Sequence, residues 1–71
     1  MRKFLIIIEP TNTGYSAYVP DLPGCIATGD TKSDIEANMY EAITFHLAGL
    51  KEEGLAIPES KSEAEVLLIA G

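Results

Sequence analysis

Few side chains in this sequence have the types and spacing that catalysis requires. His46 is the only histidine, and no cysteine or second histidine stands at metal-ligand spacing from it. Cys25, the only cysteine, has the acidic residues Asp21 and Asp30 nearby in sequence, which disfavour a reactive thiolate. No serine, histidine and aspartate set for nucleophilic attack can be assembled either. The sequence therefore predicts a protein without an enzymatic activity, a metal site or a cofactor.

The acidic side chains leave one catalytic alternative open. Glu9, at the end of an apolar run, could meet Glu36 or Glu41 of a downstream helix and hold magnesium between carboxylates, as some nucleases do. Eleven acidic residues in so short a chain make such coincidences common, and helical spacing places Glu41 opposite the apolar positions. A magnesium-dependent nuclease is therefore not the favoured interpretation.

The charge balance argues against nucleic acid as a direct partner. Eleven acidic and five basic side chains give a formal net charge of −6 at pH 7, which repels a phosphate backbone and suits a basic protein. A single cysteine is typical of a reducing compartment. The apolar run over residues 4–8 is too short for a signal peptide, and no stretch approaches the roughly 20 apolar residues that span a bilayer. We therefore expect a cytoplasmic protein that binds neither membranes nor nucleic acids directly.

Length and hydrophobic periodicity predict one α+β domain over residues 1–71. Runs of β-branched and aromatic residues between turn residues predict strands, and apolar residues at helical spacing predict one helix. The predicted elements are strands over residues 3–8, 15–19 and 25–28, a helix over residues 32–53, and a strand over residues 64–70. This β-β-β-α-β order predicts an antiparallel meander with a fourth strand, and one helix packed on one face of the sheet.

Two short motifs predict the turns that connect these elements. Pro23 and Gly24 suit the two central positions of a type II turn, because proline presets φ and glycine takes a positive φ. Thr31, with an acid three residues on, predicts a helix N-cap, and Ser33 with Glu36 is a competing start. The residues that we expect to act as scaffold are Pro20, Pro23, Gly24, Gly29, Asp30 and Thr31.

The first and last predicted strands are apolar on both faces. Alternate side chains of a strand point to opposite faces, and residues 4–8 and 66–69 leave neither face polar. One helix covers only one face of a sheet, so the other face or a strand edge is expected to form an apolar interaction surface. A chain of this length also has a small core. These features predict a homodimer or homotetramer whose interface includes Leu5, Ile7, Leu67 and Ile69.

The chain also resembles the HicB-like antitoxins over nearly its whole length. The residues that carry the resemblance are Tyr15-Ser-Ala-Tyr18, Pro20-Asp-Leu-Pro-Gly-Cys25, Thr28-Gly-Asp-Thr31, Asp34-Ile-Glu-Ala-Asn38, Glu41-Ala42, Gly54 and Ile57-Pro58. The resemblance implies a partial ribonuclease-H-like fold that lacks the active site. It also implies a protein partner, namely a small basic HicA-like toxin of double-stranded-RNA-binding-like fold that degrades messenger RNA.

The resemblance implies a function, and the loop, strand and outer-helix positions of this sequence provide the candidate contacts for it. The function is that of an antitoxin in a type II toxin-antitoxin system, which binds the toxin and masks its active site with an acidic surface. The expected contact residues are Tyr18, Asp21, Leu22, Glu41 and Glu52. Many members carry a C-terminal DNA-binding domain, and since this sequence ends at Gly71, the resemblance does not extend to DNA binding. The alternative interpretation is an orphan homo-oligomeric regulatory module that has no cognate toxin.

Overall fold

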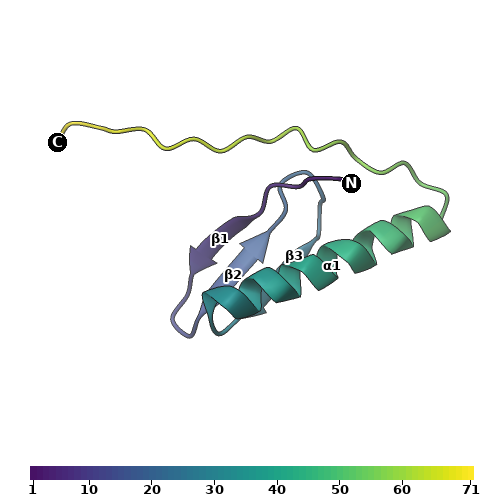
Figure 1. Ribbon diagram of the computed structural model, residues 1–71, viewed down its shortest axis with the longest axis horizontal. Helices are drawn as coiled ribbons and strands as arrows, with labels where there is room; N and C mark the ends of the chain where they lie inside the picture. Colours follow the sequence, from purple (N-terminus) through teal and green to yellow (C-terminus); the bar gives the residue numbers. More distant parts are fainter.

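A computed structural model describes residues 1–71, and Figure 1 shows a small sheet with one long helix across it. The elements are β1 (Ile7–Pro10), β2 (Tyr15–Tyr18), β3 (Ile26–Gly29) and α1 (Lys32–Glu52). The strands lie in the order β1-β2-β3, and both neighbouring pairs are antiparallel. The α+β class, the three-stranded meander and the single helix on one sheet face are therefore confirmed.

The first strand begins later than the sequence pattern predicts. Strand β1 starts at Ile7, which pairs with Tyr18, whereas the apolar run predicted a strand over residues 3–8. Beyond Tyr18 the chain turns away from β1, and Pro20 has no N–H to donate to a longer ladder. Residues 1–6 consequently make no backbone hydrogen bond.

Two consecutive reverse turns connect β2 to β3. The Leu22 N–H donates to the Val19 carbonyl (3.2 Å), and the Cys25 N–H donates to the Leu22 carbonyl (3.1 Å). The second turn has Pro23 and Gly24 at its centre, and Gly24 has a φ of 82°, as a type II turn requires. The predicted turn is therefore confirmed.

The helix begins where the sequence predicts. The Thr31 hydroxyl accepts a hydrogen bond from the backbone N–H of Asp34 (3.1 Å), which makes Thr31 the N-cap. The first turns of α1 lie so close to β3 that a Cβ atom at Gly29 would stand 2.7 Å from the backbone nitrogen of Ile35. Glycine is therefore needed at this crossing. No helix of this structure combines the length and the apolar character that crossing a bilayer requires.

The core lies between α1 and one face of the sheet. Its fully buried residues are Ala17, Val19, Leu22, Cys25, Ile35 and Met39. Partly buried side chains surround them, among them Phe4, Ile6 and Ile8. Because Ile8 faces the core, its neighbour Ile7 points to the other side of the sheet. Six buried residues of 71 make a small core, as expected for a chain of this length.

The C-terminal part of the chain corrects the predicted fourth strand. No residue after α1 belongs to a helix or a strand, and residues 56–71 make no hydrogen bond from backbone to backbone. Figure 1 shows this segment, in green to yellow, running extended past the sheet, with its end well beyond it. The predicted strand over residues 64–70 does not form because a strand needs a hydrogen-bonded neighbour, and none lies alongside. The ribonuclease-H-like arrangement therefore stays a prediction.

Candidate partner-binding surface

Neither the cysteine nor the histidine is placed for catalysis. Cys25 is buried in the core, and its removal from water raises the pKa of the thiol. A thiol with a raised pKa is a poor nucleophile at neutral pH. His46 is half-buried on α1, among the apolar positions of that helix. No three His, Cys, Asp or Glu side chains stand close enough together to hold a metal ion.

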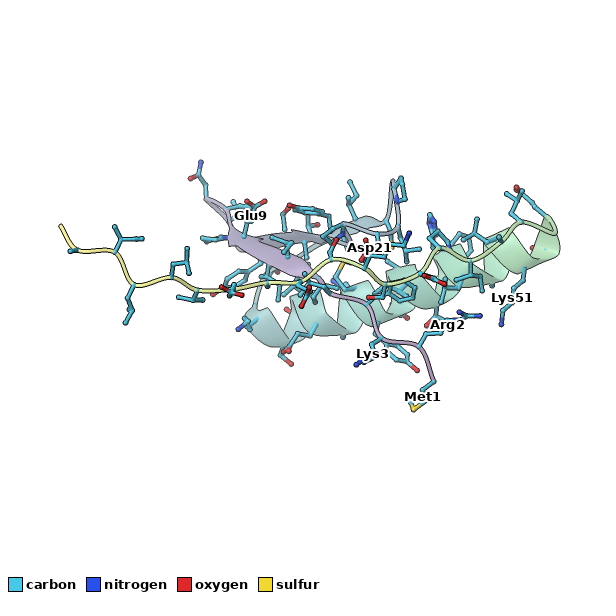
Figure 2. The ribbon with its side chains drawn as sticks, turned by 90° about the horizontal axis from the view of Figure 1, so that it is seen from above. Met1, Arg2, Lys3, Glu9, Asp21 and Lys51 are labelled. Atoms are coloured by element: carbon cyan, nitrogen blue, oxygen red, sulfur yellow. The ribbon has the colours of Figure 1, made fainter.

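The acidic side chains considered for a magnesium site lie on opposite sides of the sheet. Ile8 packs against the core beneath α1, so its neighbour Glu9 points to the helix-free face. Figure 2 shows Glu9 at the end of β1, away from the helix. Glu36 and Glu41 belong to α1 and are exposed. Their carboxylates therefore do not converge with that of Glu9 on one ion.

The helix-free face of the sheet carries an apolar row that crosses all three strands. Ile7, Tyr18 and Ile26 are register partners, so their side chains stand next to one another. Tyr18 is 39% exposed and Ile26 is 69% exposed. Sequence reasoning named Ile7 and Tyr18 for two different roles and missed Ile26. The three residues are neighbours only because of the pairing register between the strands, and the sequence of one strand does not contain that register.

The outer face of α1 is a second exposed surface that combines apolar and charged groups. Glu41, Phe45, Ala48 and Glu52 recur at helical spacing and are all exposed, Phe45 at 82%. We call these four residues the outer helix face. An aromatic anchor with a charged rim is typical of protein-binding surfaces. Sequence reasoning missed Phe45, although a large aromatic residue outside the core-facing stripe of a helix indicates a candidate binding surface.

The five predicted contact residues do not share one surface. Tyr18 lies on the helix-free face of the sheet, whereas Glu41 and Glu52 lie on the outer helix face. Leu22 is 0% exposed, so the prediction that its side chain contacts a partner is wrong. The two turns on either side of Leu22 direct it into the core. Asp21 is only partly buried, but its carboxylate is already engaged within the chain.

Asp21 holds the C-terminal segment against the body of the protein. Its Oδ2 accepts the backbone N–H groups of Lys61 (3.0 Å) and Ser62 (2.9 Å), and its Oδ1 accepts the Ser62 hydroxyl (2.9 Å). The backbone N–H of Ser62 is the main cause that lowers the pKa of the Asp21 carboxyl, and partial desolvation opposes it. Figure 2 shows Asp21 beside this segment. Its role in the structure is thus an intramolecular tether.

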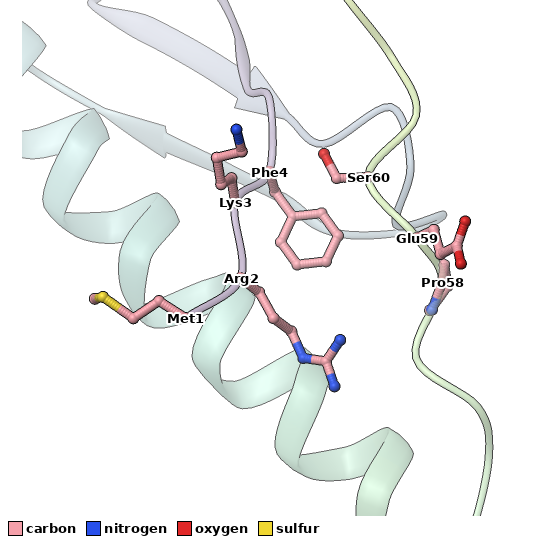
Figure 3. Close-up of a pocket in the computed structure, with 7 residues that line it drawn as sticks. All are labelled: Met1, Arg2, Lys3, Phe4, Pro58, Glu59 and Ser60. Atoms are coloured by element: carbon pink, nitrogen blue, oxygen red, sulfur yellow. The ribbon is translucent and has the colours of Figure 1, made fainter.

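Two hollows lie where the N-terminal residues meet the rest of the chain. One, of about 350 Å³, is lined by residues 1–4 and 58–60 and is drawn in Figure 3. The other, of about 410 Å³, lies between the N-terminal residues and α1, with Arg2 and Lys51 at its border. Figure 2 shows Arg2, Lys3 and Lys51 toward one end of the molecule. Acidic side chains accompany these bases, since Glu59 lines the first hollow and Glu52 follows Lys51 on the helix.

Comparison with known families identifies the domain. Residues 4–68 match the family described as "HicB_like antitoxin of bacterial toxin-antitoxin system". The chain belongs to the HicB-like antitoxin family. The resemblance that the turn and cap motifs indicated is thereby confirmed, and membership of an antitoxin family indicates a role in binding.

Three relatives show how widely this HicB-like domain occurs. The domain is 47% identical to an uncharacterized 14.9 kDa protein in the rep-hol intergenic region of Haemophilus phage HP1, over 78% of this chain and 41% of the phage protein. It is 37% identical to a UPF0150 protein of Thermoplasma acidophilum, over 86% of this chain and 90% of that protein. A UPF0150 protein of Helicobacter pylori J99 is 36% identical, over 79% and 78%. The chain thus spans less than half of the phage relative but most of the other two.

A solved structure connects this HicB-like fold to a toxin-antitoxin assembly. One chain of a structure described as "HicA3 and HicB3 toxin-antitoxin complex" matches with a TM-score of 0.73 and 35% sequence identity. The match covers 84% of this chain and 70% of that chain. Family and structural likeness together support an antitoxin role for the HicB-like domain.

Proposed function

We propose that this HicB-like domain is the antitoxin of a type II toxin-antitoxin system and that it binds and masks a small, basic, messenger-RNA-degrading toxin of HicA type. The observation that carries the proposal is the family match over residues 4–68, joined by the likeness to a chain of a HicA–HicB complex. The net charge of −6 supports a basic partner, since opposite charges steer association and favour it.

The outer helix face is the docking surface that we propose for the toxin. Phe45 supplies an exposed aromatic side chain of the kind that dominates binding energy when a partner buries it. Glu41 and Glu52 stand on either side, about 17 Å apart along the helix axis. Two carboxylates at this spacing can engage cationic side chains that otherwise bind RNA phosphates. Tyr18 lies on the opposite side of the sheet and is not part of this surface.

Binding to a HicA-type toxin tests the proposal directly. The full chain and the toxin encoded beside it are co-purified, and their affinity is measured by calorimetry. We expect Phe45→Ser and the double variant Glu41→Gln/Glu52→Gln each to weaken binding at least tenfold, because the first removes the anchor and the second removes the charge complementarity. Both variants are also expected to protect RNA from cleavage by the toxin less well, in proportion to their loss of affinity.

Matched controls separate the docking surface from general effects. Ile26→Ser removes an exposed apolar side chain from the other side of the sheet, and Glu9→Gln/Glu59→Gln removes the same charge away from the helix. Both controls are expected to bind like the unaltered chain, and all variants are expected to keep the same melting temperature. A toxin that binds both Phe45→Ser and Glu41→Gln/Glu52→Gln with unaltered affinity would place the docking surface elsewhere.

The second candidate function is an orphan homo-oligomeric module without a cognate toxin. The observation that favours it is the exposed apolar segment at the C-terminal side, which is suited to self-association. The same experiment distinguishes the two candidates. Neither a complex with the neighbouring gene product nor rescue of growth from it is expected of an orphan module.

A further inference from the structure

Residues 63–71, here called the C-terminal arm, hold four consecutive large apolar side chains in water. Val66, Leu67, Leu68 and Ile69 are 92%, 69%, 98% and 82% exposed. Consecutive residues of an extended segment point to opposite sides, so the arm is apolar on both sides. Its backbone also has no hydrogen-bond partner within the chain. An exposed, extended, two-sided apolar segment of this kind is suited to join a sheet.

The arm leaves the body of the protein at a fixed point and runs outward. The Asp21 carboxylate holds Lys61 and Ser62, and beyond them the chain passes the sheet, as Figure 1 shows. The radius of gyration is 14.0 Å, against about 11 Å for a compact chain of this length. Nine extended residues reach about 30 Å, which exceeds the 20 Å shortest dimension of the molecule. The arm is therefore long enough to lie along an edge strand of another molecule.

The same chain offers an unpaired segment that matches the arm. Strand β1 is at the edge of the sheet, and residues 1–6 before it make no backbone hydrogen bond. The side chains at this edge are apolar toward the core at Ile6 and toward the helix-free face at Ile7. Arg2 and Lys3 precede the edge.

Charge complementarity matches the arm to this edge, and the course of the arm past its own sheet favours the edge of a second copy as the place that it joins. The arm begins with the acidic residues Glu63 and Glu65, and the segment that leads into β1 begins with the basic residues Arg2 and Lys3. The arm's apolar residues follow its acids, as the apolar residues of β1 follow its bases. Each copy thus carries both a donor and an acceptor of opposite charge, which is the condition for a closed two-fold exchange.

We propose that two copies of this chain exchange their C-terminal arms, each arm adding as a fourth strand to the β1 edge of the other copy. Strand addition pairs the backbone groups of the arm with those of the β1 edge and turns one apolar side of the arm toward the core. The other side of the arm then extends the apolar row on the helix-free face. The exchange also explains why residues 64–70, whose pattern predicts a strand, form none in the single chain. The proposal does not require a toxin, because the outer helix face takes no part in it.

Light scattering on the purified full chain tests the exchange without a toxin. We expect a mass of twice 7.6 kDa at micromolar concentration. Leu67→Lys/Leu68→Lys places charge on both sides of the arm and is expected to weaken dimerisation at least tenfold. The control Leu55→Lys/Ala56→Lys adds the same charge to exposed residues before the tether and is expected to stay dimeric. A monomeric unaltered chain, or a dimer that the arm variant does not weaken, overturns the proposal.

Disulfide trapping distinguishes exchange between copies from closure within one. Chains carrying Leu5→Cys and chains carrying Leu67→Cys are mixed and oxidised, and the buried Cys25 serves as the internal negative control. Exchange predicts a disulfide-linked pair of one chain of each kind. A chain that carries both substitutions and forms only an intramolecular disulfide, with no linked pair in the mixture, overturns the exchange in favour of a fourth strand within the same chain.

Discussion

At the residue scale, the carboxylate of Asp21 accepts hydrogen bonds as an acidic contact residue would, but its partner lies within the same chain. An acidic side chain in a loop beside two prolines suggests an exposed contact with another protein. In the structure it accepts hydrogen bonds from Lys61 and Ser62, which follow it by about 40 positions in the chain. No local pattern around Asp21 encodes this pairing. The burial of the adjacent Leu22 follows from the same turns.

The tether through Asp21 is expected to depend on pH. Its hydrogen bonds lower the pKa of the carboxyl in the folded chain, so the tether contributes stability above the pKa of about 3.9 of an unfolded aspartate. This contribution is lost as the pH falls through the lower folded-state pKa. An NMR titration is expected to show Asp21 titrating below the ordinary value, with the Ser62 amide shift following the same midpoint.

Substitution at the tether checks the cause of this shift. Ser62→Ala removes the hydroxyl donor and is expected to move the pKa of Asp21 back toward its ordinary value. Ser60→Ala, which removes a hydroxyl from the same segment but not from Asp21, is expected to leave the titration unchanged. An ordinary pKa for Asp21 in the unaltered chain would mean that the segment is not held there in solution.

At the scale of elements, the turn and the helix start follow local rules, and the strand ends do not. Pro23-Gly24 forms the predicted type II turn and Thr31 caps α1, because each depends on backbone geometry within four residues. The start of β1 depends instead on where β2 ends, so residues 3–6 lie outside the sheet despite their strong β-propensity. Strand propensity acts only where a neighbour completes the ladder.

The cap of α1 allows a quantitative check at this scale. Thr31→Ala leaves the backbone N–H of Asp34 without its side-chain acceptor and is expected to lower the free energy of unfolding by about 1 kcal/mol. Thr13→Ala is the matched control, since the Thr13 hydroxyl makes no hydrogen bond in the hairpin loop. Chemical denaturation measures both. An equal effect of the two substitutions would contradict the capping role.

At the scale of the whole molecule, the small core leaves three surfaces exposed for partners: the outer helix face, the apolar row on the sheet, and the C-terminal arm. The helix covers one side of the sheet, the apolar row of Ile7, Tyr18 and Ile26 lies on the other, and the C-terminal arm extends beyond both. The proposed toxin surface on α1 and the proposed exchange at the β1 edge use different residues. The two proposals taken together predict that toxin and second copy bind at the same time, without competing for one surface.

The small core makes its central side chain indispensable. Leu22→Ala is expected to cost about 2–5 kcal/mol, a large part of the stability available to a domain of this length. Circular dichroism is expected to show a loss of cooperative unfolding near room temperature. Leu55→Ala, at a side chain that is 53% exposed, is expected to have little effect. A stable, folded Leu22→Ala chain that only loses toxin binding would restore Leu22 as a contact residue.

Five features could be predicted from the sequence: the fold class, the strand order of the meander, the turn at Gly24, the cap at Thr31 and the family. The turn and the cap depend on residues within a few positions of each other. The fold class and strand order follow from the spacing of apolar residues, and the family follows from its turn and cap motifs. Four features become visible only in three dimensions: the burial of Leu22, the tether from Asp21 to a distant segment, the exposure of Phe45, and the absence of the fourth strand from the single chain. Each of these depends on which segments meet in space, and strand pairing and burial are set by that meeting rather than by local propensity.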